Sequence, residues 1–142
     1  MTSDNVSNSL VTILVRPELE NDRLNELFHD SWPGHETIDF KPILTRSLVW
    51  VAAFLESNLV GFVNVIGDGG IHAIILDAVV HMEHRGKGVG KSLVCTAVEK
   101  TRDFGARVLH VDYEPGLEQF YRSCGFRTIS GGLMTFSDDA PA

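Results

Sequence analysis

A glycine-rich segment, residues 84–92, restricts what this chain of 142 residues can fold into more than any other part of the sequence. Its letters are HRGKGVGKS, and it stands between an apolar run over residues 71–80 and a helical pattern that starts at Val89. Glycine lets the backbone approach a bulky ligand closely, and the first N–H groups of a helix have no intrahelical partners. A strand, a glycine turn and a helix start in this order predict a site for an anion such as a phosphate.

Length and composition indicate one globular domain over residues 1–142, with flexible tails at residues 1–8 and 138–142. The apolar fraction of 44% is that of an ordinary soluble protein. Because we find neither a signal peptide nor a membrane-spanning run, we expect a cytoplasmic protein with no membrane partner. The net charge of −7 disfavours nucleic acid as a partner and is compatible with an amine substrate, although acidity for solubility explains it equally well.

Hydrophobic periodicity predicts an α/β chain with the element order βααβββαβαβ. The expected strands cover residues 10–15, 48–55, 59–66, 71–80, 107–113 and 133–136. The expected helices run from Pro17 to a break at residues 31–35, over residues 40–45, from Val89 to a stop at Gly105, and over residues 116–123. Hairpins join the second, third and fourth strands, and a helix connects the fourth strand to a parallel fifth. The result is a mixed, mostly antiparallel central sheet flanked by helices.

Two common nucleotide-binding motifs do not fit the glycine-rich segment. A P-loop, G-x-x-x-x-G-K-[ST], needs glycine at the position of Arg85, and it normally follows the first strand of its domain. A dinucleotide-binding G-x-G-x-x-G fails on spacing. A glycine-rich helix start without any ligand is the remaining alternative, and the conformational entropy of three glycines in five residues counts against it.

The remaining fit is Arg85-x-x-Gly88-x-Gly90, which resembles the pyrophosphate signature Q/R-x-x-G-x-G/A of the GNAT superfamily of acyl-CoA-dependent N-acyltransferases. The flanking residues 80–88 resemble that family's V-x-P-x-x-R-G-x-G, with Met82 in place of proline. Further along, residues 120–126, FYRSCGF, resemble its F-Y-x-x-x-G-F element. The two elements have the family's order and about its spacing. The resemblance extends over residues 48–136 and reaches the first third of the chain only through element order.

This resemblance implies acetyl-CoA as the co-substrate and a splayed pair of parallel strands, residues 71–80 and 107–113, where its pantetheine arm enters. The backbone of the strand before the loop would bind that arm, and backbone N–H groups of the loop would bind the pyrophosphate. The residues implied for the strand are Ala78, Val79 and Val80, and those for the loop are Arg85, Gly86, Lys87, Gly88, Val89, Gly90 and Lys91.

The implied reaction is direct attack of a neutral amine on the thioester within a ternary complex. By family position, the Val80 N–H would polarise the acetyl carbonyl, and Tyr121 would protonate the departing CoA thiolate. We expect Asp77 as the general base, because a carboxylate within an apolar strand is costly unless it is used or paired. Asp112, Glu114, His72 or a chain of water molecules are the alternatives for this role.

The acceptor amine is not identified by the sequence, because the family varies in the N-terminal third where the acceptor wall is built. Trp32, His35 and His72 are the candidate substrate contacts. We expect no metal, since the histidines and carboxylates show no ligand spacing in the sequence, and a homodimer is possible as in other members. The main alternative is a CoA-binding regulatory or interaction module with this fold and no turnover, and a Mg²⁺-dependent nucleotide-binding protein is the other.

Overall fold

The computed structural model describes residues 10–137, and the chain divides after Val111 into two compact units. The tails expected at residues 1–8 and 138–142 lie outside the described residues. The first unit holds a five-stranded sheet with helices on both of its faces, and the second holds two short helices and irregular chain.

The sheet of the first unit has its strands in sequence order, β1-β2-β3-β4-β5. Three neighbouring pairs are antiparallel and the last pair, β4 with β5, is parallel. The strands are β1 (Val11–Val15), β2 (Val49–Leu55), β3 (Asn58–Gly67), β4 (His72–Val80) and β5 (Val108–Val111). The expected mixed, mostly antiparallel sheet is therefore confirmed.

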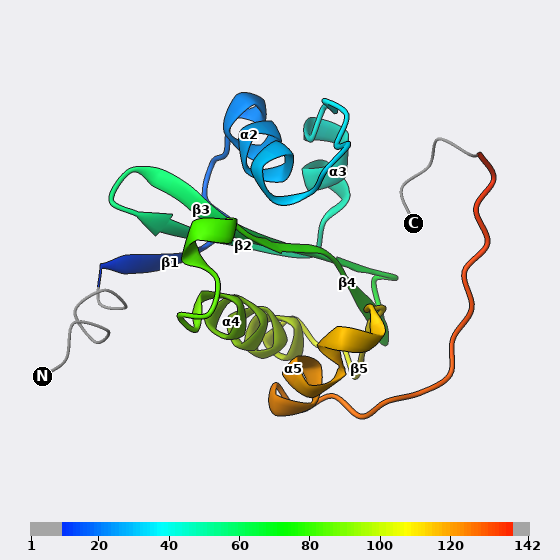
Figure 1. The fold of residues 1–142 in the computed structure, drawn as a ribbon. Helices are drawn as coiled ribbons and strands as arrows, with labels where there is room; N and C mark the ends of the chain where they lie inside the picture. Colours follow the sequence, from blue (N-terminus) through cyan, green and yellow to red (C-terminus); the bar gives the residue numbers. More distant parts are fainter. Residues whose placement is uncertain (1–9, 138–142) are drawn as a thin grey trace, which may run out of the picture. The chain divides into compact units, whose positions relative to one another are not determined.

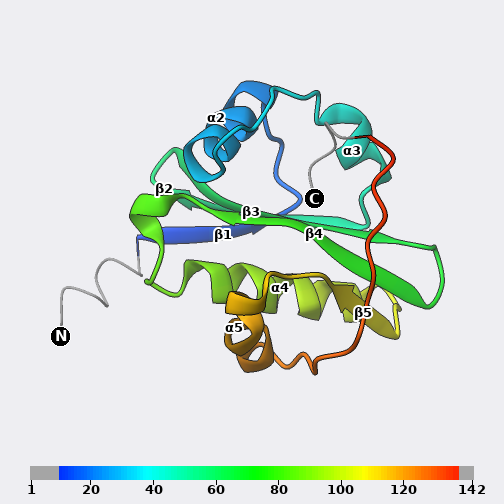
Figure 2. The same cartoon turned by 45° about the vertical axis from the view of Figure 1, so that its right-hand side comes forward.

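Helices cover both faces of this sheet, as Figures 1 and 2 show. On one face lie α2 (Asn21–Ser31) and α3 (Lys41–Arg46), which occupy the stretch between β1 and β2. On the other face lies α4 (Val89–Asp103), which packs along β2, β3 and β4. A 3₁₀ turn, η1 (Met82–His84), separates the end of β4 from the glycine-rich loop.

The core on the α2 face is an aromatic and aliphatic cluster that reaches the end of β4. Its buried members are Leu24, Leu27, Phe28, Phe40, Phe62 and Val79. Each such side chain contributes roughly 1.5–3 kcal/mol when it is fully removed from water. Because Val79 belongs to this cluster, the packing of α2 also fixes the strand end from which the glycine-rich loop departs.

The helix expected from Pro17 begins only at Asn21. The reason is a contact across 33 residues: the indole Nε1 of Trp50 donates a hydrogen bond of 2.9 Å to the carbonyl oxygen of Pro17. That carbonyl is therefore used by β2 and not by a first helical turn. The other end of the helix follows the expectation, since it stops at Ser31 before the Trp-Pro-Gly segment.

The second unit departs further from the expected elements. Its helical segment is a 3₁₀ turn, η2 (Pro115–Leu117), followed by α5 (Glu118–Ser123). The strand expected over residues 133–136 is wrong, because these residues form irregular chain in which Leu133, Met134 and Phe136 are exposed. A strand needs a neighbour to complete its ladder, and hydropathy alone does not reveal one. None of the helices within residues 10–137 has the length and apolar character to cross a membrane.

Candidate active site

The glycine-rich loop leaves open space at the N-terminus of α4. Gly86 and Gly88 have positive φ angles, 78° and 84°, which disfavour any residue with a Cβ atom. A Cβ atom added at either position would meet no heavy atom within 4 Å. The first helical bond of α4 runs from the N–H of Ser92 to the carbonyl of Gly88, so the N–H groups before it are the unpaired ones of a helix start.

The charges around this helix start suit an anion. Lys87 precedes α4 and Lys91 lies in its first turn, and both side chains are exposed. The first turn of α4 contains no acidic residue, although acidic residues are usually favoured there. The positive end of the dipole of this 15-residue helix is thus left for a ligand.

Arg85, expected to add charge to the loop, directs its guanidinium back to the protein backbone. Its Nε donates a hydrogen bond of 3.0 Å to the carbonyl of Val80. Its Nη2 donates a second, of 3.3 Å, to the carbonyl of Ser31 at the end of α2. The side chain therefore ties α2, the end of β4 and the loop together.

The pairing of β5 with β4 stops before β4 ends. Pairing of β5 with β4 runs from His72↔Val108 to Ile75↔Val111, whereas β4 continues to Val80. The N–H of His81 donates a hydrogen bond to the carbonyl of Val60 in β3. The carbonyl of Val80 belongs to the same peptide group and points in the opposite direction, so it faces away from β3. In extended backbone the N–H of Val80 points to that side as well. The parallel pair is confirmed, and the backbone of β4 after Ile75 has no partner in β5.

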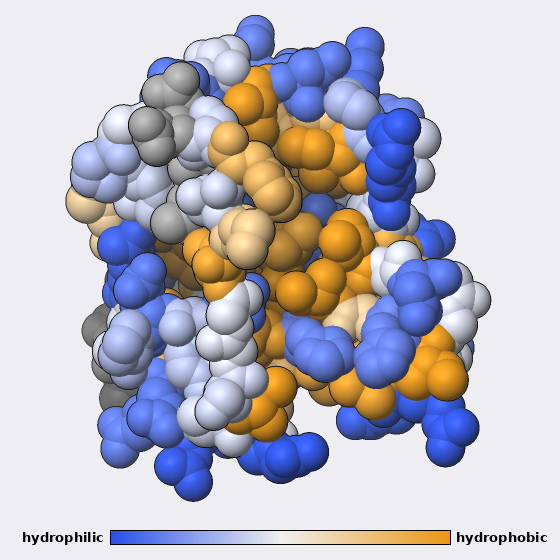
Figure 3. Space-filling model, turned by 90° about the vertical axis from the view of Figure 1, so that its right-hand side faces the viewer, coloured by the Kyte–Doolittle hydropathy of each residue, from blue (hydrophilic) through white to orange (hydrophobic). Residues whose placement is uncertain are grey.

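An apolar side chain begins the stretch of β4 that extends past its pairing with β5. Leu76 is the first residue past the last β5 pair, and it is 36% exposed although it lies inside a strand. Figure 3 shows one face of the molecule on which apolar side chains gather among hydrophilic ones. A partly exposed leucine beside backbone groups that face away from β3 is suited to a ligand with both apolar and amide character.

A β-bulge interrupts β4 at Asp77 and Ala78. Phe62 of β3 pairs with Val79, and Asn64 of β3 pairs with Leu76. Two residues of β4 therefore stand opposite the single residue that separates Phe62 from Asn64 in β3. Asp77 takes the left-handed backbone conformation, φ 55°, which is uncommon for a residue other than glycine. In a regular strand, the side chain of Asp77 would lie on the same face of the sheet as that of Val79. The bulge places Leu76 on that face instead.

The bulge leaves the Asp77 carboxyl half-buried. Burial raises its pKa above the ordinary value of 3.8, because the charged form loses solvation. A carboxylate of raised pKa accepts a proton more readily than one in water, which is the property that a general base near neutral pH requires. The chemistry of Asp77 therefore fits the expected role.

In the second unit, Tyr121 lies in an aromatic cluster and is only 5% exposed. Its ring stacks on Tyr113 with centroids 4.9 Å apart, and Phe120 and Phe126 meet it edge-on. Burial, and to a smaller extent Cys124, raises the pKa of Tyr121 above the usual 10.0. The phenol therefore stays protonated at neutral pH and can act as a proton donor.

Two of the three candidate substrate residues follow directly after α2. Trp32 stands edge-on to Phe28 at 4.9 Å and is 37% exposed. The Nε2 of His35 lies 3.0 Å from the Oδ1 of Asn25, a buried amide on α2. Trp32 is thus available for contact with a ligand, whereas His35 is engaged in holding the loop against α2.

His72, the third candidate, is at the wrong end of β4 to reach the loop. It begins the strand that Val80 ends, and eight residues of extended chain span roughly 25 Å. Its Nδ1 lies 3.1 Å from the Nε2 of His110 in β5, and both side chains are solvent-accessible. Val80 and Asp77 lie in the half of β4 nearer the loop, and His72 lies at the other end of the strand.

Sequence reasoning missed two features near these residues. Asn64, opposite Leu76, is fully buried; its Oδ1 accepts a bond from Ser47, and its Nδ2 has no partner among the described residues. A single amide in the apolar run over residues 59–66 was the available signal. The imidazoles of His81 and His84 also lie close to the Glu83 carboxylate in η1, directly before Arg85.

Comparison with known proteins places this geometry in a family. The sequence profile of the acetyltransferase (GNAT) family matches residues 17–126. The uncharacterised N-acetyltransferase ycf52 of Gracilaria tenuistipitata var. liui is 29% identical over 106 residues, which cover 72% of this chain and 58% of that protein. The GCN5-related N-acetyltransferase 1, chloroplastic, of Arabidopsis thaliana is 30% identical over 118 residues, covering 81% of this chain and 60% of that one. The matched part of the chain therefore spans less than two thirds of the length of these relatives.

Solved structures share the fold. A GNAT-family acetyltransferase of Streptococcus pneumoniae superposes with a TM-score of 0.77 at 22% identity, covering 90% of this chain and 98% of that one. The aminoglycoside N-acetyltransferase AAC(6')-Iy, solved in complex with CoA, gives a TM-score of 0.72 at 18% identity, covering 90% and 95%. The profile match takes in both the loop and the residues around Tyr121, and the chain belongs to the acetyltransferase (GNAT) family.

Proposed function

We propose that residues 1–142 are a single N-acetyltransferase domain that moves the acetyl group of acetyl-CoA to an amine by direct attack in a ternary complex. The observation that carries the proposal is the loop before α4, where two left-handed glycines leave open space at an unpaired helix start. Pyrophosphate is an anion of suitable charge for such a site. The CoA complex of a protein with the same fold supports the choice of ligand.

In this proposal the N–H groups of residues 86–91 bind the pyrophosphate. The backbone of Ala78, Val79 and Val80 binds the pantetheine arm along the stretch of β4 that β5 does not cover. The Val80 N–H, which faces away from β3, donates to the acetyl carbonyl and stabilises the oxyanion of the tetrahedral intermediate. Arg85 positions this strand end through the Val80 carbonyl.

The proton transfers are assigned to two groups of opposite character. Asp77 takes the proton of the attacking ammonium group, directly or through water, and its raised pKa makes it the better base. Tyr121 gives a proton to the CoA sulfur as the C–S bond breaks, so the products are the amide and free CoA. The acceptor approaches beside Trp32, while His35 shapes that wall from its bond to Asn25.

Acetyl-CoA binding tests the loop assignment by calorimetry. Gly88→Val should abolish binding, because the new side chain occupies the open space of the loop. Gly69→Val is the matched control: Gly69 has the same φ of 84° and equally open surroundings, but it precedes β4 at the end remote from the loop. Equal loss of binding in both variants, or none in Gly88→Val, would refute the assignment.

Turnover is tested by CoA release across a panel of peptide, polyamine, aminoglycoside and aryl- or alkylamine acceptors. Release of CoA with any amine establishes the transferase, and the amine itself identifies the acceptor class. Binding of acetyl-CoA without release with any member would favour the alternative, a CoA-binding module of this fold. A homodimer and a cytoplasmic location stay predictions; two relatives carry "chloroplastic" in their names.

A further inference from the structure

The six histidines of the chain form three spatial pairs, and one of these pairs has a carboxylate beside it. His29 and His35 meet edge-on with ring centroids 4.8 Å apart, and His72 lies against His110. The third pair, His81 and His84, has centroids 5.7 Å apart. Within residues 10–137, only this third pair forms a group of three potential metal ligands, the third being Glu83.

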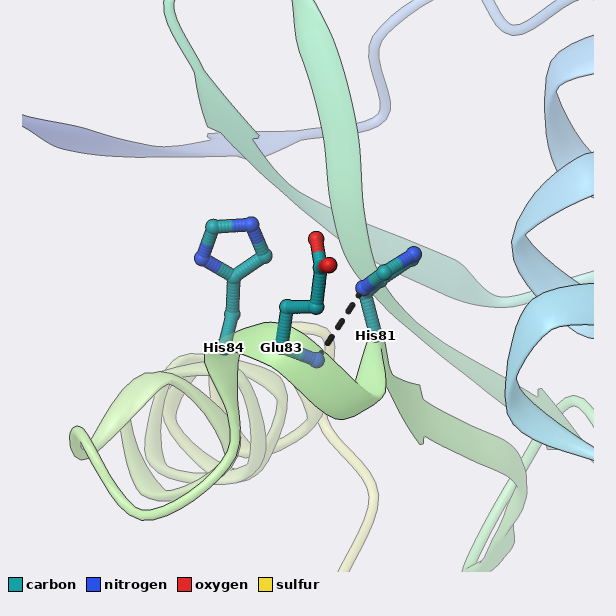
Figure 4. A group of neighbouring side chains, drawn as sticks. All are labelled: His81, Glu83 and His84. Carbon is teal, nitrogen blue, oxygen red and sulfur yellow. Dashed lines mark hydrogen bonds between the residues drawn. The ribbon is translucent and has the colours of Figure 1, made fainter.

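The three side chains point to one side of η1. Figure 4 shows the carboxylate of Glu83 standing between the two imidazole rings. One donor atom from each residue can be chosen so that all lie within 4.8 Å of one another. Ligand atoms around a tetrahedral zinc ion are about 3.3 Å apart, given bonds of about 2.0–2.1 Å. Glu83 is exposed and the two histidines are partly exposed, so modest side-chain rotations would close that difference.

The backbone of Glu83 and the carboxylate of Asp30 together hold His81 in one tautomer and one orientation. The Nδ1 of His81 accepts the backbone N–H of Glu83, so its proton is on Nε2. Nε2 in turn lies 3.4 Å from a carboxylate oxygen of Asp30 on α2. Metal-binding histidines usually give their second N–H to a carboxylate in this way, which fixes the tautomer and strengthens the ligand. The lone pair of Nδ1 is thereby directed to the side of Glu83.

We infer that His81, Glu83 and His84 form a binding site for a divalent transition-metal ion, with Zn²⁺ as the best fit, and that Asp30 orients His81 from outside the site. Two imidazoles and one carboxylate suit Zn²⁺ and disfavour Mg²⁺ and Ca²⁺, which prefer oxygen ligands. The ion replaces the Glu83 N–H as the partner of Nδ1 and leaves at least one coordination position for water. This inference departs from the absence of metal expected from the sequence, and it does not depend on the proposed enzymatic activity.

Through His81 and its contact with Asp30, the ion would reinforce the link between α2 and the entry to the glycine-rich loop. Its three ligands lie within four consecutive residues of the chain, and His81 links it to Asp30 on α2. Arg85, the next residue, already bonds to the end of the same helix. Metal binding would therefore strengthen a connection that the protein makes in its absence.

Zn²⁺ binding to tag-free protein, measured by competition with a chromogenic chelator, tests the site. We expect one ion per chain, no competition from Mg²⁺, and an affinity at least about tenfold lower for His84→Gln and Glu83→Gln. Asp30→Ala should lower affinity by about 10–100-fold, as loss of an orienting partner typically does. The matched control is His72→Gln, which disrupts the His72–His110 pair and should bind as the wild type does.

The wild-type protein supplies a second measurement that does not depend on the folding of any variant. On titration with Zn²⁺, the imidazole NMR signals of His81 and His84 should shift, while those of His29, His35, His72 and His110 should not. Unchanged affinity in His84→Gln, or shifts confined to the other two pairs, would overturn the inference. Equal weakening by His72→Gln and His84→Gln would indicate nonspecific surface binding and would also overturn it.

Discussion

The guanidinium of Arg85 donates a hydrogen bond to the carbonyl of Val80, five residues before it, at 3.0 Å. Arg85 begins the loop and Val80 ends the strand whose N–H is assigned to the acetyl carbonyl, so this bond connects the two halves of the proposed CoA site. The second hydrogen bond of Arg85, to the carbonyl of Ser31, connects the loop and the end of β4 to α2.

Arg85→Ala should lower the free energy of unfolding by about 1–3 kcal/mol, because a charged donor to two carbonyls is lost. The KM for acetyl-CoA should rise by a factor that changes little between 50 and 300 mM salt, since the effect acts through backbone position. Arg85→Lys is the control that keeps the charge but not the two-pronged geometry. If Arg85→Lys behaves as wild type and the Arg85→Ala effect fades with salt, the side chain contacts the pyrophosphate directly.

Tyr121→Phe should lower kcat by up to about 10²–10⁴-fold with little change in acetyl-CoA affinity, because only the proton donor is removed. The phenyl ring can keep the stack on Tyr113. Tyr113→Phe is the matched control, since it removes a hydroxyl that lies 3.1 Å from the Oγ1 of Thr128 and should leave kcat near the wild-type value. Full activity in Tyr121→Phe would refute the acid role.

Asp77→Asn should remove the acidic limb of the profile of kcat/KM against pH. In the wild type that limb should lie above pH 3.8, because burial raises the pKa of Asp77. Asparagine has nearly the same shape and tolerates the left-handed backbone at this position, so the fold should be kept. An unaltered limb in the variant would transfer the role to Asp112, Glu114 or water.

The same carboxyl should shape stability against pH. The folded protein binds the Asp77 proton more tightly than the unfolded chain does, so this group stabilises the fold fully below pH 3.8. That contribution is lost as the pH rises through the folded pKa. Asp77→Asn cannot ionise, and its free energy of unfolding should exceed that of the wild type above the folded pKa. Urea titrations at pH 4 and pH 8 measure the difference, and an equal gap at both values would contradict it.

Gly61→Ala should destabilise the fold by about 1–3 kcal/mol through overpacking between β3 and α4. The new Cβ would stand 2.7 Å from the Cδ1 of Leu93 and 3.3 Å from the Cβ of Ala53. Leu93→Ala alone should cost about 2–5 kcal/mol, because it leaves a cavity. The double variant should lose less than the sum of the two, and strict additivity in thermal or urea unfolding would exclude this contact.

The sequence was sufficient for those parts of the fold that depend on local pattern. The strands of the first unit, the end of α2 at Ser31 and the end of α4 before Gly105 follow from hydrophobic period and from residues that stop helices. The start of α2 could not be predicted, because it depends on Trp50 reaching Pro17. Contacts of this kind join residues that no local window contains.

The candidate site likewise has features that the sequence predicts and features that depend on contacts between distant residues. The glycines of the loop are recognisable because their backbone conformation restricts residue type at each position. The direction of the Arg85 side chain and the remoteness of His72 from the loop depend on where α2 and β5 lie, so sequence spacing could not supply them. The bulge at Asp77 likewise appears only when β3 and β4 are aligned.

The bulge at Asp77 distinguishes what the sheet requires of β4 from what the proposed site requires of it. Deleting Ala78 would let β3 and β4 pair without interruption, and Leu76 and Val79 would keep their partners in β3. The sheet alone therefore has no need of a ninth residue in β4. A protein selected only for folding could lose Ala78 and have a more regular sheet. Selection that keeps this residue therefore acts on the side of β4 that faces away from β3, and not on the pairing of the two strands.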